Sequence, residues 1–272
     1  MFLNSPKHIF GVDFSGAVKA GKKIWISKGR IAGDQLLVED CFQGKELPGS
    51  GMNRENCLKA LVSFIVAQDS SIFGLDFPFG IPARVVEGRT WEEFVESFPD
   101  EYTSPDEFRR ISLSKAGGKE LKRKTDREKR TPFSPYNLRL YRQTYFGIRE
   151  VLHPLIRDRL AYVVPMYKPE VSKPVIVEVC PASLLKEEDL YLPYKGGNNN
   201  KEGQRKHILE QFEKRAYLTN LPERIHLSVL KDTEGDALDS ILACFAAFRA
   251  LRNFDFLSLV GVHPYSVEGF VA

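Results

Sequence analysis

Cysteine is scarce in this chain, and its placement argues against two classes of protein. Cys41, Cys57, Cys180 and Cys244 lie far apart, with no Cys-x-x-Cys pair and no histidine at zinc-finger spacing. A disulfide framework and a zinc module are therefore not expected. The pattern predicts reduced, mostly buried thiols, which is typical of a cytoplasmic protein.

Long hydrophobic runs and strong charge imbalance are also missing. The longest apolar stretch, Ile241 to Phe248, is far shorter than the roughly 20 residues that a membrane-spanning helix needs. The net charge of +3 is too small to indicate a nucleic-acid-binding protein by itself. The chain has no P-loop, no Gly-x-Ser-x-Gly turn and no His-Glu-x-x-His pair, and its five histidines do not cluster.

With 43% apolar and 28% charged residues, the composition is that of a soluble globular protein with a sizeable core. Three short strands joined by brief, glycine-containing links predict an antiparallel meander. These strands are expected over residues 8–13, 22–27 and 35–41. Asn53 is predicted to cap a helix over 54–68, and a strand over 72–77 follows. A helix-length connection lets this strand pair parallel with the first one.

The second half of the chain predicts one insertion and a return to the sheet. Residues 83–172 lack strand alternation and are expected to form a helical, partly basic insertion. The remaining elements are expected to be strands over 175–179 and 225–230 and helices over 182–188, 202–216 and 236–251. The expected fold is a single α/β domain over 1–272, with a mixed five-stranded sheet of order 3-2-1-4-5 and helices on both faces.

Acidic residues stand where an active site of such a sheet would lie. Asp13, Asp76 and Glu178 are at or near the ends of three predicted strands, and Asp236 and Asp239 open the last helix. In an open α/β sheet, the carboxyl ends of parallel strands face one crevice. Buried acids are costly unless they are paired, protonated or bound to cations. Several carboxylates converging on one crevice therefore predict a divalent-metal site.

Each acid also has an ordinary structural interpretation. Asp13 or Asp76 alone can cap a turn, and Asp236 lies in a first helical turn, where the helix dipole favours any carboxylate. Glu178 can be a ligand, or it can pair with a lysine or arginine at the sheet edge. Taken together the acids favour the metal site, because four independent caps need not fall at one end of one sheet.

Basic residues concentrate in the insertion. Twelve lysines and arginines lie between Arg109 and Arg142, against three acidic residues. We expect phosphate contacts from Lys122, Arg123, Lys124, Arg127, Arg130, Arg139 and Arg142. The aromatic residues that could stack on bases are Tyr136, Tyr141, Tyr145 and Phe146. The predicted partner is DNA or RNA; the alternative is a solvated loop.

Five motifs along the chain resemble domain-of-unknown-function family 429, whose members are regarded as predicted ribonuclease H-like nucleases. They are Gly11-Val-Asp-Phe-Ser-Gly16, Gly74-Leu-Asp-Phe-Pro-Phe-Gly80, Glu178-Val-Cys-Pro181, Gly235-Asp-Ala-Leu-Asp239 and Tyr265-Ser-Val-Glu-Gly-Phe270. The resemblance implies a ribonuclease H-like three-layer fold. It also implies that the functional acids are Asp13, Asp76, Glu178, Asp236 and Asp239.

These acids predict a metal-dependent nuclease. Two Mg²⁺ or Mn²⁺ ions about 3.5–4 Å apart can activate a water and stabilise the leaving oxygen of a phosphodiester. We expect Asp13, Asp76, Asp236 and Asp239 to bind the metal, with Asp236 and Asp239 on one helical face. Two alternatives remain at this point: an actin-like or sugar-kinase-like phosphotransferase, and a non-catalytic nucleic-acid-binding protein of the same fold.

Overall fold

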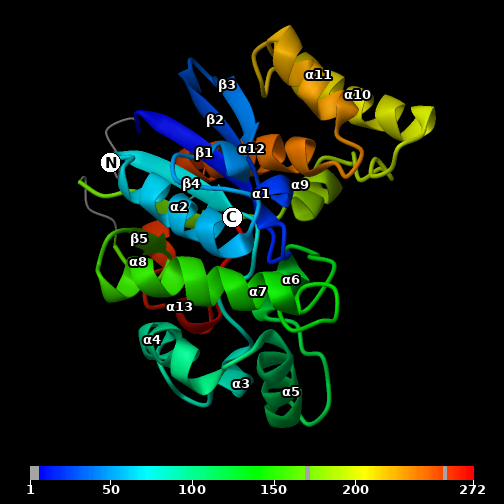
Figure 1. Ribbon diagram of the computed structural model, residues 1–272. Coiled ribbons are helices and arrows are strands. Elements are labelled where there is room, and N and C mark those ends of the chain that lie inside the picture. The colour runs from blue at the N-terminus through cyan, green and yellow to red at the C-terminus, as the bar shows by residue number, and fades with distance from the viewer. Residues whose placement is uncertain (1–5, 169–171, 254–255) are drawn as a thin grey trace.

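The computed structural model describes residues 6–168, 172–253 and 256–272, and a mixed six-stranded sheet organises them (Figure 1). The strands are β1 (His8–Asp13), β2 (Trp25–Ala32), β3 (Gln35–Gln43), β4 (Ser71–Leu75), β5 (Tyr162–Val164) and β6 (Val175–Glu178). They lie in the order β3-β2-β1-β4-β6-β5. The first three strands form an antiparallel meander, and β1, β4, β6 and β5 are mutually parallel.

The meander and the parallel pairing of β1 with β4 are confirmed. The prediction of five strands is wrong, because β5 adds a sixth strand at the edge beside β6. This strand lies inside the 83–172 segment, which was expected to be helical. Its three residues are too few to show an alternating pattern, so the sequence carries no periodic signal for it.

Helices cover both faces of the sheet. One face packs against α2 and the helices of the 83–172 segment, and the other packs against α9, α10, α11 and α12. The α-helices are α1 (Ala20–Lys23), α2 (Arg54–Val66), α3 (Ala83–Val86), α4 (Trp91–Glu101), α5 (Pro105–Lys115), α6 (Lys124–Glu128), α7 (Tyr141–Gly147), α8 (His153–Arg157), α9 (Pro181–Glu187), α10 (Asn199–Lys214), α11 (Glu223–Lys231), α12 (Asp236–Asn253) and α13 (Tyr265–Glu268). Short 3-10 or π turns are η1 (Gly44–Glu46), η2 (Ile148–Leu152) and η3 (Phe256–Leu259).

Local sequence signals explain where several helices begin. The Asn53 side chain accepts a hydrogen bond from the Asn56 backbone at 2.9 Å, which confirms the predicted cap of α2.

The strand predicted over 225–230 is wrong. This segment belongs to α11, whose buried Ile225 and Val229 lie four residues apart, a helical spacing. No helix in the described part of the chain is both long and apolar enough to cross a membrane.

Two glycines let α12 lie directly against the sheet. A Cβ on Gly11 would come 2.0 Å from the backbone nitrogen of Cys244, and one on Gly74 would come 2.7 Å from a backbone oxygen of the same helix. Side chains therefore cannot be accommodated at these positions. Because strand residues two apart share a face, Asp13 and Asp76 lie on the α12 side of β1 and β4.

Candidate functional site

Four carboxylates gather where β1 and β4 end beneath the start of α12. Asp13 is the last residue of β1, Asp76 follows β4, and Asp236 and Asp239 lie in the first turn of α12. Asp13 and Asp239 are only 8% and 3% exposed. The negative charges of Asp76, Asp236 and Asp239 all act on Asp13. The structure thus brings together the four predicted metal ligands, which we call the acid cluster.

The acid cluster carries more negative charge than its surroundings neutralise. Burial, reinforced by Asp239 and Asp236, raises the pKa of Asp13 well above its usual range. Burial and Asp239 raise the pKa of Asp76 to about 8, against the opposing effect of Lys195. Burial, opposed by Lys195 and reinforced by nearby acids, raises the pKa of Asp236 to about 7. Such a group of carboxylates binds protons or cations near neutral pH.

One lysine and one tyrosine from the segment before α10 contact the acid cluster. The Lys195 ammonium lies 2.7 Å from Oδ2 of Asp239, and the Tyr194 hydroxyl donates to Oδ1 at 2.5 Å. Burial disfavours the charge of Lys195, but Asp239 and Asp13 outweigh it and raise the pKa of the ammonium. The buried guanidinium of Arg205 donates to the Tyr194 carbonyl at 2.7 Å, which holds this segment in place. The sequence has no spacing signal that predicts these contacts.

Glu178 lies at the predicted end of the sheet but does not join the acid cluster. It pairs with Leu75 in the β4–β6 register, so it faces the insertion rather than α12. Its carboxylate accepts hydrogen bonds from Arg123 at 2.5 and 2.8 Å and from the Phe79 backbone at 3.0 Å. Burial raises the pKa of Glu178, and Arg123 opposes that effect. The alternative expected from the sequence, pairing with an arginine, is the arrangement observed.

The prediction that Arg123 contacts phosphates is wrong. Its side chain is 1% exposed and lies 2.8 Å from Asp126 as well as against Glu178. It also donates to the Glu268 carbonyl at 2.9 Å. Burial disfavours its charge, but Asp126 and Glu178 outweigh burial and raise the pKa of Arg123 well above its usual range. Arg123, Asp126 and Glu178 form a buried ion-paired group that we call the Arg123 cluster.

The other predicted phosphate contacts divide into two groups. Most have protein partners: Lys122 (Thr131 carbonyl), Lys124 (Glu128), Arg127 (Lys122 carbonyl), Arg130 (Lys186 carbonyl) and Arg142 (Asp106). Arg139 is exposed and has no ion pair among the residues that the structure describes. The predicted base-stacking role of Tyr136, Tyr141, Tyr145 and Phe146 is wrong, because all four are buried in the core.

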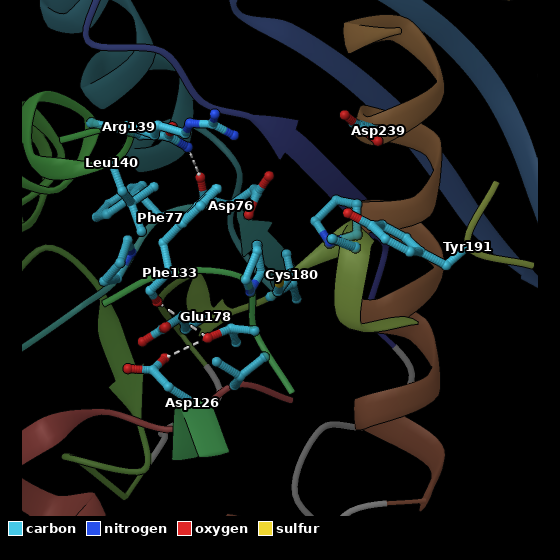
Figure 2. Close-up of a pocket in the computed structure, with 18 of the residues that line it drawn as sticks. Asp76, Phe77, Asp126, Phe133, Arg139, Leu140, Glu178, Cys180, Tyr191 and Asp239 are labelled. Atoms are coloured by element: carbon cyan, nitrogen blue, oxygen red, sulfur yellow. Dashed lines mark hydrogen bonds between the residues drawn. The ribbon is translucent and has the colours of Figure 1, made fainter. Parts of the chain in front are cut away.

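A cavity of about 560 Å³ opens beside the acid cluster. Figure 2 shows Asp76 in the middle of its lining, with Phe133, Leu140 and Arg139 on one side and Tyr191 and Asp239 on the other. Lys195 and the Arg123 cluster also line it. The cavity therefore has acidic, basic and aromatic walls drawn from the sheet, the insertion and the segment before α10.

In the conformation observed, Asp239 is bound to Lys195 and Tyr194. Among the described residues, no three His, Cys, Asp or Glu side chains are placed to hold one metal ion together. Coordination of one ion by three or more of these carboxylates therefore requires the side chains to turn, and coordination by Asp239 requires the Lys195 ion pair to open. Carboxylate oxygens remain the right donors for a hard divalent cation.

Comparisons with protein-family models, with curated proteins and with solved structures found no match. What the site can do chemically is therefore inferred from its own side chains. These are four carboxylates with three raised pKa values, one lysine in contact with them, and an adjoining open cavity.

Proposed function

We propose that this protein is a metal-dependent nuclease that hydrolyses phosphodiester bonds of DNA or RNA. The observation that carries the proposal is the acid cluster, whose partly uncompensated charge lies beside an open cavity. Structural carboxylates are normally paired with a cation where they are buried, as Glu178 is with Arg123. Carboxylates held together with raised pKa values are typical of functional sites.

The donor chemistry of the acid cluster fits Mg²⁺ or Mn²⁺, which prefer carboxylate and water oxygens. Asp13, Asp76, Asp236 and Asp239 would hold the ion. When bound, it would neutralise these carboxylates and lower the pKa of a coordinated water. Lys195 lies at the same place and supplies a positive charge that can contact a phosphate oxygen of the substrate once it leaves Asp239.

The sheet supports the relation to ribonuclease H-like proteins and to domain-of-unknown-function family 429, which remains part of the proposal. A meander of three strands continued by parallel strands, with acids after β1 and β4 and on the last long helix, agrees with that architecture. The sixth strand, β5, is an addition to it. The four cysteines are free thiols, which favours a reducing compartment, and we propose the cytoplasm.

The proposal predicts that Asp13→Asn abolishes turnover while the fold persists. The amide keeps the shape of the side chain but removes a metal-binding charge, so we expect a loss of about 100-fold or more. Labelled single-stranded and duplex DNA and RNA, incubated with Mg²⁺ or Mn²⁺, provide the assay. Asp69→Asn is the matched control. Asp69 is exposed and precedes β4, so it lies at the other end of this strand from Asp76.

Two outcomes would contradict the mechanism. Cleavage by the Asp13→Asn variant at the wild-type rate would show that Asp13 has no role in the mechanism. Cleavage in excess chelator would show that the reaction does not need a metal. Metal-dependent binding of nucleic acid without any cleavage would instead support a non-catalytic binding protein.

A further inference from the structure

We infer that the cavity beside the acid cluster binds one unstacked nucleotide, so that the substrate is a single strand or a frayed end rather than a continuous duplex. The inference about the substrate rests on the proposed nuclease function. Binding of a nucleotide in the cavity does not depend on the nuclease function, so it can be tested separately.

The size of the cavity suits a single nucleotide. A volume of about 560 Å³ lies within the range of roughly 300–1,000 Å³ found for small-ligand sites. Such a space admits one base with its sugar and phosphate, whereas paired and stacked bases are too large to enter. A nucleotide can enter a cavity of this size from a single strand or after leaving the stack, as it does in enzymes that carry out chemistry on a base.

Aromatic side chains form part of the cavity wall. Tyr191 lines the cavity and is 53% exposed, so its ring is accessible to a ligand. The Lys186 ammonium lies 4.8 Å from the centre of this ring, which helps to hold it in place. Phe133 and Leu140 lie across the cavity (Figure 2). An exposed ring in a recess offers a stacking surface that every base can use.

Positively charged side chains lie on two sides of the cavity. Arg139 and Lys195 both line the cavity, the first on the side of the insertion and the second at Asp239. The Arg139 guanidinium lies 5.5 Å from the centre of the Phe133 ring, and it forms no ion pair among the described residues. A nucleotide combines the two features that these walls complement, an aromatic base and an anionic phosphate. With the phosphate at Lys195, the scissile bond would lie beside the acid cluster.

Binding of adenosine 5′-monophosphate, measured by calorimetry with Mg²⁺ present, tests the inference without any turnover. Ribose 5-phosphate, which lacks the base, separates stacking from phosphate binding. Tyr191→Ala should weaken binding of the nucleotide by about 5- to 150-fold, whereas Tyr191→Phe should keep most of it. Leu138→Ala is the control, because Leu138 is exposed on the insertion but does not line the cavity.

Equal affinities for the two phosphates, unchanged binding by Tyr191→Ala, or no binding of the nucleotide would overturn the inference. A preference for cleaving single strands that persists in Tyr191→Ala would also count against it. Failure of the proposed function gives a different result: the nucleotide still binds in a Tyr191-dependent manner, but no nucleic acid is cleaved. Cleavage of nucleic acid without binding of the nucleotide would support the nuclease function and contradict the nucleotide site.

Discussion

The acid cluster and the Arg123 cluster lie at the same end of the same sheet, yet their carboxylates differ in how they are paired with cations. In the Arg123 cluster, the carboxylates of Glu178 and Asp126 share one buried guanidinium at 2.5 and 2.8 Å. In the acid cluster, Lys195 contacts Asp239, and Lys23 acts on Asp236 without contacting it. Both carboxylates of the Arg123 cluster therefore contact a cation, whereas only Asp239 of the acid cluster does so among the described residues.

The difference follows from which face of the sheet each acid occupies. Asp13 and Asp76 point toward α12, which brings two more acids, whereas Glu178 points toward the insertion, which brings an arginine. An acid at a strand end is therefore not functional by position alone. The useful distinction is whether the opposing element neutralises its charge, because uncompensated buried charge reduces stability and persists where function requires it.

The largest expected effect breaks the Arg123 cluster. Arg123→Ala leaves two buried carboxylates without their partner, so we expect the free energy of unfolding to fall by about 3–5 kcal/mol. Urea denaturation measures this change. Arg127→Ala replaces an exposed arginine of α6, the helix that Arg123 precedes, and should change it by less than about 0.5 kcal/mol. A similar small change for both variants would show that the buried pairs do not hold the insertion to the sheet.

Most of the sheet could be predicted because its strands carry local signals. The alternating or β-branched runs of β1, β3, β4 and β6 and the Asn53 cap of α2 are properties of neighbouring residues. The edge strand β5 could not be found, since three residues show no periodicity. For α11, a β-branched and apolar composition favoured a strand, while burial of one helical face by tertiary packing decided the outcome.

The candidate site was predictable only in part, for a similar reason. Gly-x-Asp occurs at the ends of both β1 and β4, and the glycines that admit α12 are the signal that ties these two acids to the helix. The face occupied by Glu178 depends on strand register, which one sequence does not contain. The burial of Arg123 and the contact between Lys195 and Asp239 depend on tertiary packing between distant segments.

A smaller effect concerns pH and the acid cluster. Asp76 has a pKa of about 8 in the folded protein against 3.8 as a free side chain, so the folded state holds this proton more tightly. Stability without metal should therefore fall as pH rises from about 4 to about 8. Asp76→Asn removes this proton linkage, so the Tm of this variant should rise relative to the wild-type Tm as pH increases over that range.

Thermal denaturation in chelator at several pH values measures this difference in Tm. Asp69→Asn, at an exposed residue two positions before β4, should follow the wild-type protein. Added Mg²⁺ should raise the wild-type Tm more at pH 8 than at pH 6, because protons and the metal compete for the same carboxylates. A constant difference between Asp76→Asn and wild type across pH would show that the charge of Asp76 is already compensated.

The smallest expected effect separates the two kinds of arginine in the insertion by their response to salt. Each phosphate contact on a single strand contributes a log–log slope of about −0.7 to the dependence of affinity on salt concentration. Arg139 lines the cavity without an ion pair in the described residues, so Arg139→Ala should reduce the slope by about one such contact. Arg110→Ala, an exposed arginine on α5 beside Glu107, should leave it unchanged. Equal reductions in both variants would mean that phosphates follow the basic surface of the insertion in general, and that the cavity holds no privileged contact.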